Sequence, residues 1–407
     1  MSAKNDIAVV LGTRPEIIKL AGVIRNLGSR GSIHYTGQHY DDELSESFFR
    51  TFKLPAPQLL LNGISGEHRS IQISRATYQL AEHFRRVSPR LVIVQGDTNS
   101  ALAGAQAANY CGIPVLHVEA GLRSNDRNMP EEINRRLVSV LADVHCAPTS
   151  WNAANLVSEG IPLYAVRVTG NTIVEATCES LPGVEESREI LGKYGLCENE
   201  FILATIHRPE NTDDPQRLAE IIDALCEAPI PVLFPVHPRT AESVRAFGLA
   251  DRLSRIRRVP PLDYSTFLSL ASHARLLISD SGGIQEECTI IKKPLVVVRR
   301  NTERPEALAS GFAVRVRHRH EISEEITRIL ANSELARILV NRPCPFGDGK
   351  ASERITEIAL AVADGGALPP GERLGEFSYT CEPQVVQGGA VGRALLRSPV
   401  QRGSLAQ

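Results

Sequence analysis

Several features that mark other classes of protein are missing from this chain. No apolar run approaches the roughly 18 residues of a membrane-spanning helix, and the first residues lead into a short apolar strand without the pattern of a signal peptide. The formal net charge is −2, so neither sign dominates as it would on a nucleic-acid or membrane surface. We therefore expect no nucleic-acid partner and no membrane partner.

Paired cysteines and a dinucleotide-binding turn are also missing. The eight cysteines include no Cys-x-x-Cys pair, which argues against a zinc site or a disulfide framework and predicts reduced thiols in the cytoplasm. No other set of side chains resembles a metal site. The turn after the first strand is not Gly-x-Gly-x-x-Gly, which counts against a nicotinamide or flavin cofactor. We predict no metal and no cofactor.

What the sequence does contain is a steady alternation of short apolar strands and longer amphipathic helices. This pattern predicts an α/β fold, and the Val/Ile/Leu character of the strands predicts parallel sheets that are covered on both faces. We expect helices at residues 67–87 and 351–363. We expect strands at residues 7–11, 33–36, 91–95, 115–118, 144–147, 165–168, 201–205, 232–235, 276–279, 295–298 and 313–316.

The length of 407 residues exceeds what one core usually supports, so two domains are expected. The pattern restarts after residues 168–171, where a strand ends and a helix begins. We predict one domain at residues 1–170, a second at 171–350 and a terminal helix at 351–364. The tail at 365–407 is rich in Gly, Pro and Ser and is predicted to be disordered or loosely docked, with one apolar patch at 385–396.

A stretch near residue 280 has the pattern of a phosphate-binding turn. An apolar run at 276–278 predicts a buried strand that ends in Ser281, Gly282 and Gly283, where a helical pattern begins. The unpaired N–H groups of a helix N-terminus attract an anion, and glycine lets the backbone approach it. Glu287, one turn inside this helix, is an acceptor for ribose hydroxyls. The stretch predicts a nucleoside diphosphate site, and a packing turn without a ligand is the alternative.

A second candidate anion site follows the first strand. Residues 12–16 read Gly-Thr-Arg-Pro-Glu, and Pro15 marks the first turn of a helix that carries Lys19. Arg14 and Lys19 are unfavourable near the positive end of a helix dipole unless an anion joins them, so we assign both to phosphate. The alternative is a surface ion pair between Lys19 and Glu16.

Three acidic side chains are candidates for proton transfer. Asp97 and Glu119 each follow a predicted strand, and Glu131 lies at the start of a helix. Because parallel strands end at one edge of a sheet, we expect the three to converge, and paired carboxylates commonly move protons at a sugar carbon. Simpler roles are a turn cap for Asp97 and a helix-start acid for either Glu131 or Glu132. Glu119 ends an apolar strand, where an isolated acid is costly to bury.

Two histidines and one arginine follow strands in the second half. His207 and His237 occupy equivalent strand ends, where a histidine can donate to a phosphate oxygen or protonate a leaving group near neutral pH. Arg304 lies at a predicted helix start and marks a further anion site. Six other histidines are interpreted as structural: His34, His39, His68, His83, His318 and His320.

These motifs together are specific. From residue 12 to residue 307 the chain carries, in this order, Gly-Thr-Arg-Pro-Glu, Gly-Asp-Thr, His-Val-Glu-Ala-Gly-Leu-Arg, Pro-Glu-Glu-x-Asn-Arg, Thr-Gly-Asn-Thr, His-Arg-x-Glu-Asn, Pro-Val-His, Asp-Ser-Gly-Gly-Ile-Gln-Glu-Glu and Thr-Glu-Arg-Pro-Glu-Ala. Residues 346–350 extend the match to about residue 362, so only the tail lies outside it. The chain resembles the non-hydrolysing UDP-N-acetylglucosamine 2-epimerase family.

The resemblance implies two Rossmann-like doubly wound domains that face a central cleft, as in glycosyltransferase-B folds. The first would hold the sugar and the acid/base groups, the second would hold UDP, and the terminal helix would cross back to the first. It implies a UDP-sugar substrate, a homodimer, and interconversion of UDP-GlcNAc and UDP-ManNAc through a 2-acetamidoglucal. The implied acid/base residues are Asp97, Glu119 and Glu131, with His207 assisting the leaving phosphate. The implied UDP-binding residues are Arg14, Lys19, His237, Ser281, Gly282, Gly283, Glu287 and Arg304.

Two segments depart from the family pattern. Residues 38–41 replace a Gln-His-Arg-type segment that helps to bind an activating second substrate molecule in many bacterial relatives, and residues 208–214 resemble members that act on modified sugars. The resemblance therefore leaves open allosteric activation and the sugar's substituents. The alternatives are a 2-epimerase of a modified UDP-sugar such as a diacetamido-uronic acid, a hydrolysing epimerase that releases ManNAc and UDP, a glycosyltransferase, and a nucleotide-sugar-binding protein without turnover.

Overall fold

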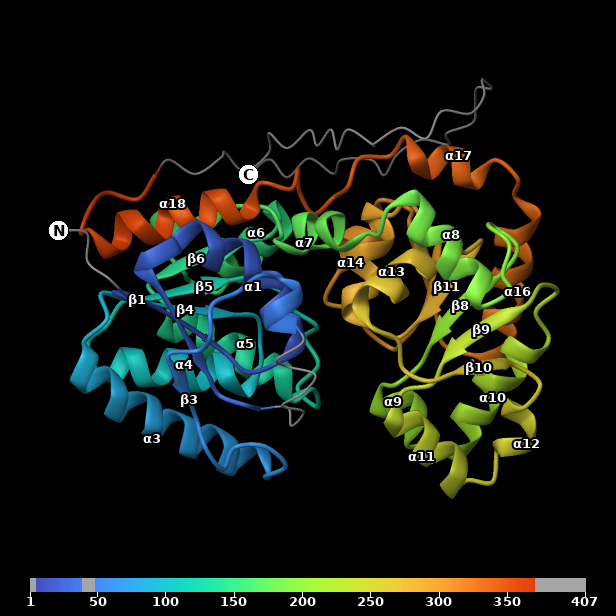
Figure 1. Ribbon diagram of the computed structural model, residues 1–407, viewed down its shortest axis with the longest axis horizontal. Coiled ribbons are helices and arrows are strands. Elements are labelled where there is room, and N and C mark those ends of the chain that lie inside the picture. The colour runs from blue at the N-terminus through green and yellow to red at the C-terminus, as the bar shows by residue number, and fades with distance from the viewer. Residues whose placement is uncertain (1–4, 39–47, 370–407) are drawn as a thin grey trace, which may run out of the picture.

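The strands of this chain form two parallel sheets that lie side by side (Figure 1). The computed structural model describes residues 5–38 and 48–369. Within that part of the chain, strands that end by Val168 make up the first sheet, and strands from Ile202 onward make up the second. The predicted α/β class with two Rossmann-like doubly wound units is confirmed.

The first sheet has the strand order β3-β2-β1-β4-β5-β6-β7. One of its faces packs against α1 and α18 through side chains such as Leu20 and Ile355, and the other packs against α3 and α4 through Leu80 and a series of alanines. The strands are β1 (Ile7–Leu11), β2 (Gly31–Tyr35), β3 (Leu59–Leu60), β4 (Leu91–Gln95), β5 (Val115–Val118), β6 (Val144–Ala147) and β7 (Val166–Val168).

The second sheet has the strand order β10-β9-β8-β11-β12-β13. One face packs against α10 and α16, through Ile221 and Ile326 for example, and the other packs against α8, α13 and α14. The strands are β8 (Ile202–Thr205), β9 (Val232–Pro235), β10 (Arg257–Val259), β11 (Leu276–Ser279), β12 (Leu295–Val298) and β13 (Ala313–Val316).

The helices cover both faces of each sheet, as parallel sheets require. In the first half they are α1 (Arg14–Leu27), α3 (Arg69–Val87), α4 (Asn99–Tyr110), α5 (Pro130–Leu141), α6 (Ser150–Ser158) and α7 (Ile173–Ser180). In the second half they are α8 (Val184–Lys193), α9 (Pro209–Thr212), α10 (Pro215–Cys226), α11 (Pro238–Ala246), α12 (Ala250–Leu253), α13 (Tyr264–His273), α14 (Gly282–Ile290), α15 (Pro305–Ala309), α16 (Arg319–Ala331), α17 (Leu335–Val340) and α18 (Ala351–Ala363).

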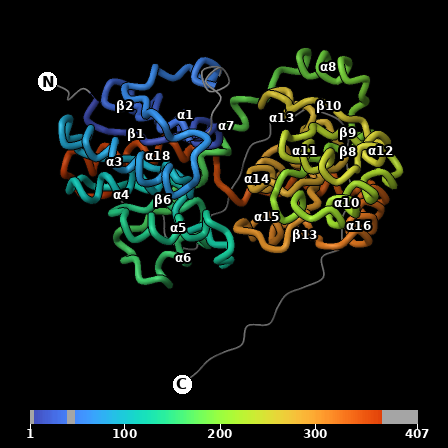
Figure 2. Tube along the Cα trace, turned by 90° about the horizontal axis from the view of Figure 1, so that it is seen from below, coloured from blue at the N-terminus to red at the C-terminus, as the bar shows by residue number. Residues whose placement is uncertain are grey.

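Helix α18 returns to the half of the molecule in which the chain began. Figure 1 shows this red helix lying over the half that contains blue β1 and α1, and Ile355 and Ile358 belong to the same buried cluster as Ile7. Seen from below in Figure 2, the two halves stay separate, with α7 at their junction. The division into domains at residue 170 stays a prediction, and residues 370–407 of the predicted tail lie outside the described residues.

Each sheet has one place where the strand order reverses, and the site lies there. In the first sheet the reversal falls between β1 and β4, and in the second between β8 and β11. The connections on either side of such a point lead away from each other, which leaves a crevice beyond the carboxyl ends of the two strands. Gly12, which follows β1, is required here because a Cβ would lie 1.9 Å from Thr36 Oγ1.

Candidate active site

A cavity of about 740 Å³ lies between the two sheets, at the carboxyl ends of their strands. Its wall comes from turns after β1, β4, β5, β8 and β11, from the starts of α5 and α14, and from the segment before α15. Eleven of the twelve residues predicted for the site line it: Arg14, Lys19, Asp97, Glu119, Glu131, His207, Ser281, Gly282, Gly283, Glu287 and Arg304.

The twelfth predicted residue, His237, does not belong to that lining. It is the exposed N-cap of α11, where its side chain accepts a hydrogen bond from the backbone N–H of Arg239. Its ring centroid lies 5.3 Å from that of His207, so it stands beside the cavity. A role for His237 in binding UDP stays a prediction.

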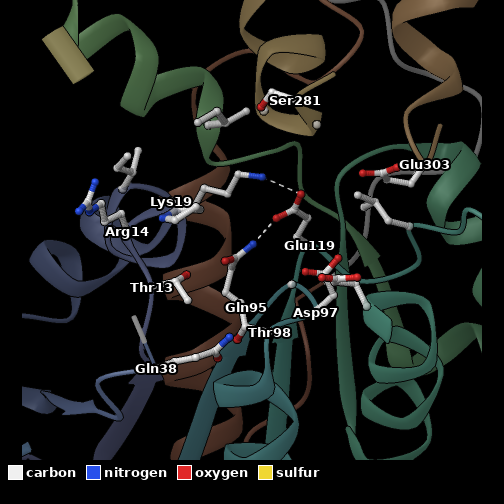
Figure 3. Close-up of a pocket in the computed structure, with 18 of the residues that line it drawn as sticks. Thr13, Arg14, Lys19, Gln38, Gln95, Asp97, Thr98, Glu119, Ser281 and Glu303 are labelled. Atoms are coloured by element: carbon white, nitrogen blue, oxygen red, sulfur yellow. Dashed lines mark hydrogen bonds and ion pairs between the residues drawn. The ribbon is translucent and has the colours of Figure 1, made fainter. Parts of the chain in front are cut away.

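Lys19 occupies the centre of the cavity rather than the surface. Its buried Nζ lies 2.7 Å from Glu119 Oε1 (Figure 3). It also lies 3.0 Å from Glu286 Oε2, so it joins the first half of the chain to α14 of the second. Glu16, the alternative partner, is fully buried and accepts hydrogen bonds from Thr13 and Thr98 instead. A surface pair between Lys19 and Glu16 is therefore excluded.

Glu119 is held by groups from three distant segments. Besides Lys19, the side-chain amide of Gln95 donates to its Oε2, and Arg304 Nη2 lies 3.4 Å from its Oε1. The backbone at Glu119 has φ 64°, a left-handed conformation that is uncommon for a residue with a Cβ. Burial raises the pKa of this carboxyl, Lys19 and Arg304 oppose that effect, and the Glu286 carboxylate reinforces it. The result is a fixed carboxyl group that takes up a proton more readily than an exposed glutamate.

Arg304 is the second cation of the cavity and is also already paired. Its Nε lies 2.7 Å from Glu286 Oε1, and its Nη1 donates to Glu303. Against the effect of burial, these carboxylates and Glu119 raise the pKa of Arg304, so it stays charged. Glu303 is buried, and although burial alone would raise its pKa, Arg304 and Arg299 hold that pKa far below its usual range. Lys19 and Arg304 are thus each paired with carboxylates inside the cavity.

Asp97 and Glu131 face the cavity from the first half of the chain. Arg135 holds the Asp97 carboxylate, with Nη2 at 2.7 Å and Nε at 2.9 Å from Oδ2. Arg135 also approaches Glu303 across the cleft, at 3.9 Å. Thr98, not Asp97, caps the start of α4, so the turn-cap role proposed for Asp97 is wrong.

The two acids at the start of α5 have different environments. Glu132 is fully buried and pairs with Arg135 at 3.0 Å and Arg136 at 3.2 Å, so it holds the helix to its surroundings. Glu131 is half-buried in the cavity wall. Of the two, Glu131 is the carboxylate that can reach a ligand.

His207 lies in the cavity wall with Asp280 behind it. His207 Nδ1 is 3.1 Å from Asp280 Oδ1, and the same carboxylate accepts the backbone N–H groups of His207 and Arg208. Asp280 is fully buried. Burial alone would raise its pKa, but the hydrogen bonds from His207, Asn211 and the backbone lower it, so this carboxylate remains ionised.

The turn after β11 has the geometry of an anion site. Helix α14 begins at Gly282, where a Cβ would lie 2.6 Å from Arg304 Nη1, so only glycine leaves room for that guanidinium. One turn later, Glu287 accepts a hydrogen bond of 3.0 Å from the hydroxyl of Tyr264. Burial raises the pKa of Glu287 to about 7, against the lowering effect of this hydrogen bond.

Several residues that shape the site were not assigned to it from the sequence. Asp280 and Glu286 stand inside the motif that predicted the anion turn, and that position is the only signal the sequence offers for them. Gln95 and Arg135 act on carboxylates that are remote in sequence. The residues missed were Gln95, Arg135, Tyr264, Asp280, Glu286 and Glu303.

Two facing Rossmann-like sheets, with anion-binding groups and carboxylates in one cleft, define the glycosyltransferase-B-like class of nucleotide-sugar enzymes. Within that class the chain belongs to the UDP-N-acetylglucosamine 2-epimerase family, whose model matches residues 27–360. It is 39% identical over 364 residues to the UDP-N-acetylglucosamine 2-epimerase of Methanocaldococcus jannaschii, a match that covers 86% of this chain and 98% of the relative.

Solved structures agree with this assignment. The crystal structure of the M. jannaschii UDP-GlcNAc 2-epimerase in complex with UDP-GlcNAc and UDP has a TM-score of 0.79 and 37% identity, covering 87% of this chain and 99% of that one. The Neisseria meningitidis UDP-GlcNAc 2-epimerase bound to UDP-GlcNAc has a TM-score of 0.80 and 32% identity, covering 87% of this chain and 99% of that one.

Proposed function

We propose that this protein interconverts UDP-N-acetylglucosamine and UDP-N-acetylmannosamine. The observation that carries the proposal is one cavity in which the cations Lys19 and Arg304, suited to a diphosphate, lie within 3.4 Å of the carboxylate Glu119. Leaving-group stabilisation and proton transfer are thereby available at adjacent atoms of one substrate. Membership of the family supports the choice of UDP-GlcNAc as that substrate.

The chemistry begins with departure of UDP, because the C2–H bond of the intact sugar is not acidic. The C1–O bond breaks, its electron pair leaves on the β-phosphate oxygen, and positive charge develops at C1. A carboxylate then removes the C2 proton, and the electrons of the C–H bond form the C1=C2 bond of a 2-acetamidoglucal. Proton delivery to the other face of C2 and re-addition of UDP at C1 give the epimer. No atom changes its net oxidation state.

Three carboxylates are assigned to the proton transfers: Asp97, Glu119 and Glu131. Asp97 and Glu119 follow neighbouring strands, β4 and β5, and Glu131 opens the helix after β5. All three line the cavity on the side of the first sheet. His207 would interact with the departing diphosphate from the side of the second sheet.

The diphosphate is expected to replace carboxylates as the partner of the cavity's cations. Lys19 and Arg304 form ion pairs with Glu119 and Glu286. When a diphosphate takes over these cations, Glu119 loses two groups that favour its ionised form and becomes a stronger base. The residues assigned to UDP are Arg14, Lys19, His237, Ser281, Gly282, Gly283, Glu287 and Arg304.

A homodimer in the cytoplasm completes the proposal. The outer surface of α3, α4 and α5 carries exposed apolar side chains, among them Tyr78 (69% exposed), Tyr110 (71%) and Val140 (79%), which favour a protein partner. Among the described residues no two cysteines form a disulfide, which favours a reducing compartment. Light scattering should give twice the chain mass of 44.4 kDa, and Val140→Asp should give the single-chain mass. A monomer in the unmodified protein would contradict the dimer.

The test of function is proton NMR of UDP-GlcNAc with purified protein in deuterated water, without added metal or nicotinamide. We expect UDP-ManNAc to appear with deuterium at C2. Free ManNAc and UDP would instead identify a hydrolysing epimerase. An unchanged spectrum would contradict UDP-GlcNAc as the substrate, and UDP-diacetamido-uronic acid would be tried next.

A further inference from the structure

The carboxylate of Asp280 occupies a special place behind the cavity. It follows β11 directly, is 0% exposed, and immediately precedes Ser281 in the anion-binding turn. Strands β8 and β11 are neighbours, with Thr205 paired to Ser279, so Asp280 stands at the point where the strand order reverses. It is absent from the cavity lining and cannot touch a ligand there.

Asp280 holds the loop after β8 against the turn after β11. It accepts backbone N–H groups of His207 at 3.0 Å and Arg208 at 2.8 Å, and the side-chain amide of Asn211 at 3.0 Å. Asn211 also donates to the carbonyl of Val298 at 2.8 Å, which extends the connection to β12. A carboxylate fixed by this many donors cannot change its direction when a ligand arrives.

The same carboxylate faces one particular nitrogen of the His207 ring. Asp280 Oδ1 lies 3.1 Å from His207 Nδ1, and a carboxylate can only accept, so Nδ1 must carry a proton. Nε2 is then the nitrogen that remains for a ligand in the cavity. This is how a histidine is oriented when its second nitrogen has a chemical task.

We propose that Asp280 is a positioning residue: it fixes the His207 ring with Nδ1–H directed inward and Nε2 directed to the leaving diphosphate. The inference rests on the proposed function and deepens it. Nε2 takes up a proton when the diphosphate binds beside it. As the C1–O bond breaks and its electron pair moves onto the β-phosphate oxygen, this Nε2–H donates a hydrogen bond to that oxygen. The Nδ1–H remains hydrogen-bonded to Asp280 throughout. The Nε2–H keeps its hydrogen bond to the β-phosphate oxygen until that oxygen adds back to C1.

A purely structural role for Asp280, as a support for the loop, predicts a different result from a double-mutant cycle. An asparagine at this position retains one acceptor oxygen, but presents an N–H donor where the ring needs an acceptor. We expect Asp280→Asn to lower kcat about a hundredfold, with KM nearly unchanged. In a His207→Gln background the same substitution should cost less than about threefold, because the group it positions is gone. A second hundredfold loss would overturn the proposal.

A measurement on the unsubstituted protein keeps the proposal falsifiable if Asp280→Asn does not fold. Long-range nitrogen–proton NMR distinguishes the two neutral forms of each histidine, and the signal that disappears in His207→Gln identifies the ring. At a pH where this ring is neutral, we expect a proton on Nδ1 and none on Nε2. The reverse would overturn the proposal. This readout needs no turnover, so inactivity on UDP-GlcNAc would contradict the proposed function while the Asp280 arrangement is still decided by the spectrum.

Discussion

The two sheets each place a fully buried carboxylate where their strand order reverses, but the two differ in charge state. Asp280, between β8 and β11, bonds to the His207 ring as well as to amide groups, and these interactions lower its pKa. Glu16, beside the reversal between β1 and β4, accepts from uncharged donors: the backbone N–H groups of Gly12 and Thr13 and the hydroxyls of Thr13 and Thr98. Burial then raises its pKa to about 7. Since both are 0% exposed, the partners decide which carboxylate stays ionised.

The difference matches a division of work across the cleft. On the side of the second sheet, Asp280 and Glu303 have lowered pKa values and stay charged, whereas burial raises the pKa of Glu287 to about 7, and we propose that this side holds the diphosphate. On the side of the first sheet, burial raises the pKa of Glu119, which lines the cavity, and the proposed proton transfers are assigned to this side. Substitutions on the two sides should therefore damage different steps.

The largest effect is expected on the side of the first sheet. Glu119→Gln should lower kcat by about 10²–10⁴-fold, because an amide cannot exchange the C2 proton. Affinity for UDP, measured by calorimetry, should stay within about threefold, since Lys19 keeps Glu286 as a partner. Glu159→Gln, at a partly exposed carboxylate that pairs with Arg123, is the matched control and should leave kcat unchanged. Near-normal turnover in Glu119→Gln would contradict the assignment of Glu119 to proton transfer. The contrast between the two sides of the cleft would then not hold.

A smaller effect should appear in the pH dependence of stability. Native Glu16 binds a proton up to about pH 7, whereas in the unfolded chain it ionises near its ordinary value of 4.5. The contribution of Glu16 to the free energy of unfolding is therefore fully present below about pH 4.5 and is lost as pH rises to 7. The Glu16→Gln protein should not show this loss. The free energy of unfolding of the wild type relative to Glu16→Gln should fall by about 2.5 kcal/mol between pH 5 and pH 8, with a slope of up to about 1.4 kcal/mol per pH unit between the two pKa values.

Denaturant titrations at pH 5, 6, 7 and 8 measure this difference, and the contribution of Glu287, whose pKa is also about 7, cancels between the two proteins. The same comparison with Glu159→Gln should be flat over this range, because Arg123 outweighs the effect of burial and lowers the pKa of Glu159 from its ordinary value. A flat profile for Glu16→Gln as well would mean that Glu16 is ionised like Asp280, and the contrast between the two reversal points would disappear.

The smallest effect is expected on the side of the second sheet and should affect binding only. Tyr264→Phe removes the hydroxyl that donates to Glu287, so the carboxyl proposed to meet the ribose is no longer fixed. One hydrogen bond is worth about 1 kcal/mol, which weakens UDP about fivefold and leaves kcat at saturation unchanged. Tyr78→Phe, at an exposed tyrosine, serves as the control in the same calorimetric titration. A loss in kcat instead of affinity would place Tyr264 among the residues that act on the sugar.

Most of the fold could be predicted from the sequence because most strands are buried on both faces and read as apolar runs. The two strands that were missed, β3 and β10, are the outer strands of their sheets. β3 has two residues, and β10 begins with two exposed arginines, so neither contains an apolar run of useful length. Element ends shifted by a residue or two, as at α3, where His68 is the cap and not part of the helix.

Site residues could be predicted where their place at the end of a strand brings them to the cavity. They could not be predicted where their role depends on a side chain that is remote in sequence. Asp97, Glu119 and His207 were found because polar side chains at the carboxyl ends of parallel strands converge. Glu286 was missed because its partner Lys19 is 267 residues away. Local sequence also gave no means of telling Glu131 from Glu132, which only the pairing of Glu132 with Arg135 separates.

The ion pairs that cross the cleft have a consequence for which anions can bind. Lys19 and Arg304 carry internal counter-ions, Glu119 and Glu286, so a small anion would meet these two cations already paired. An orthophosphate would have to compete with two carboxylates that are already in place. A nucleotide can do so because its base and ribose add contacts elsewhere along the cavity. The resident carboxylates thus act as a filter that favours a ligand large enough to reach both ends.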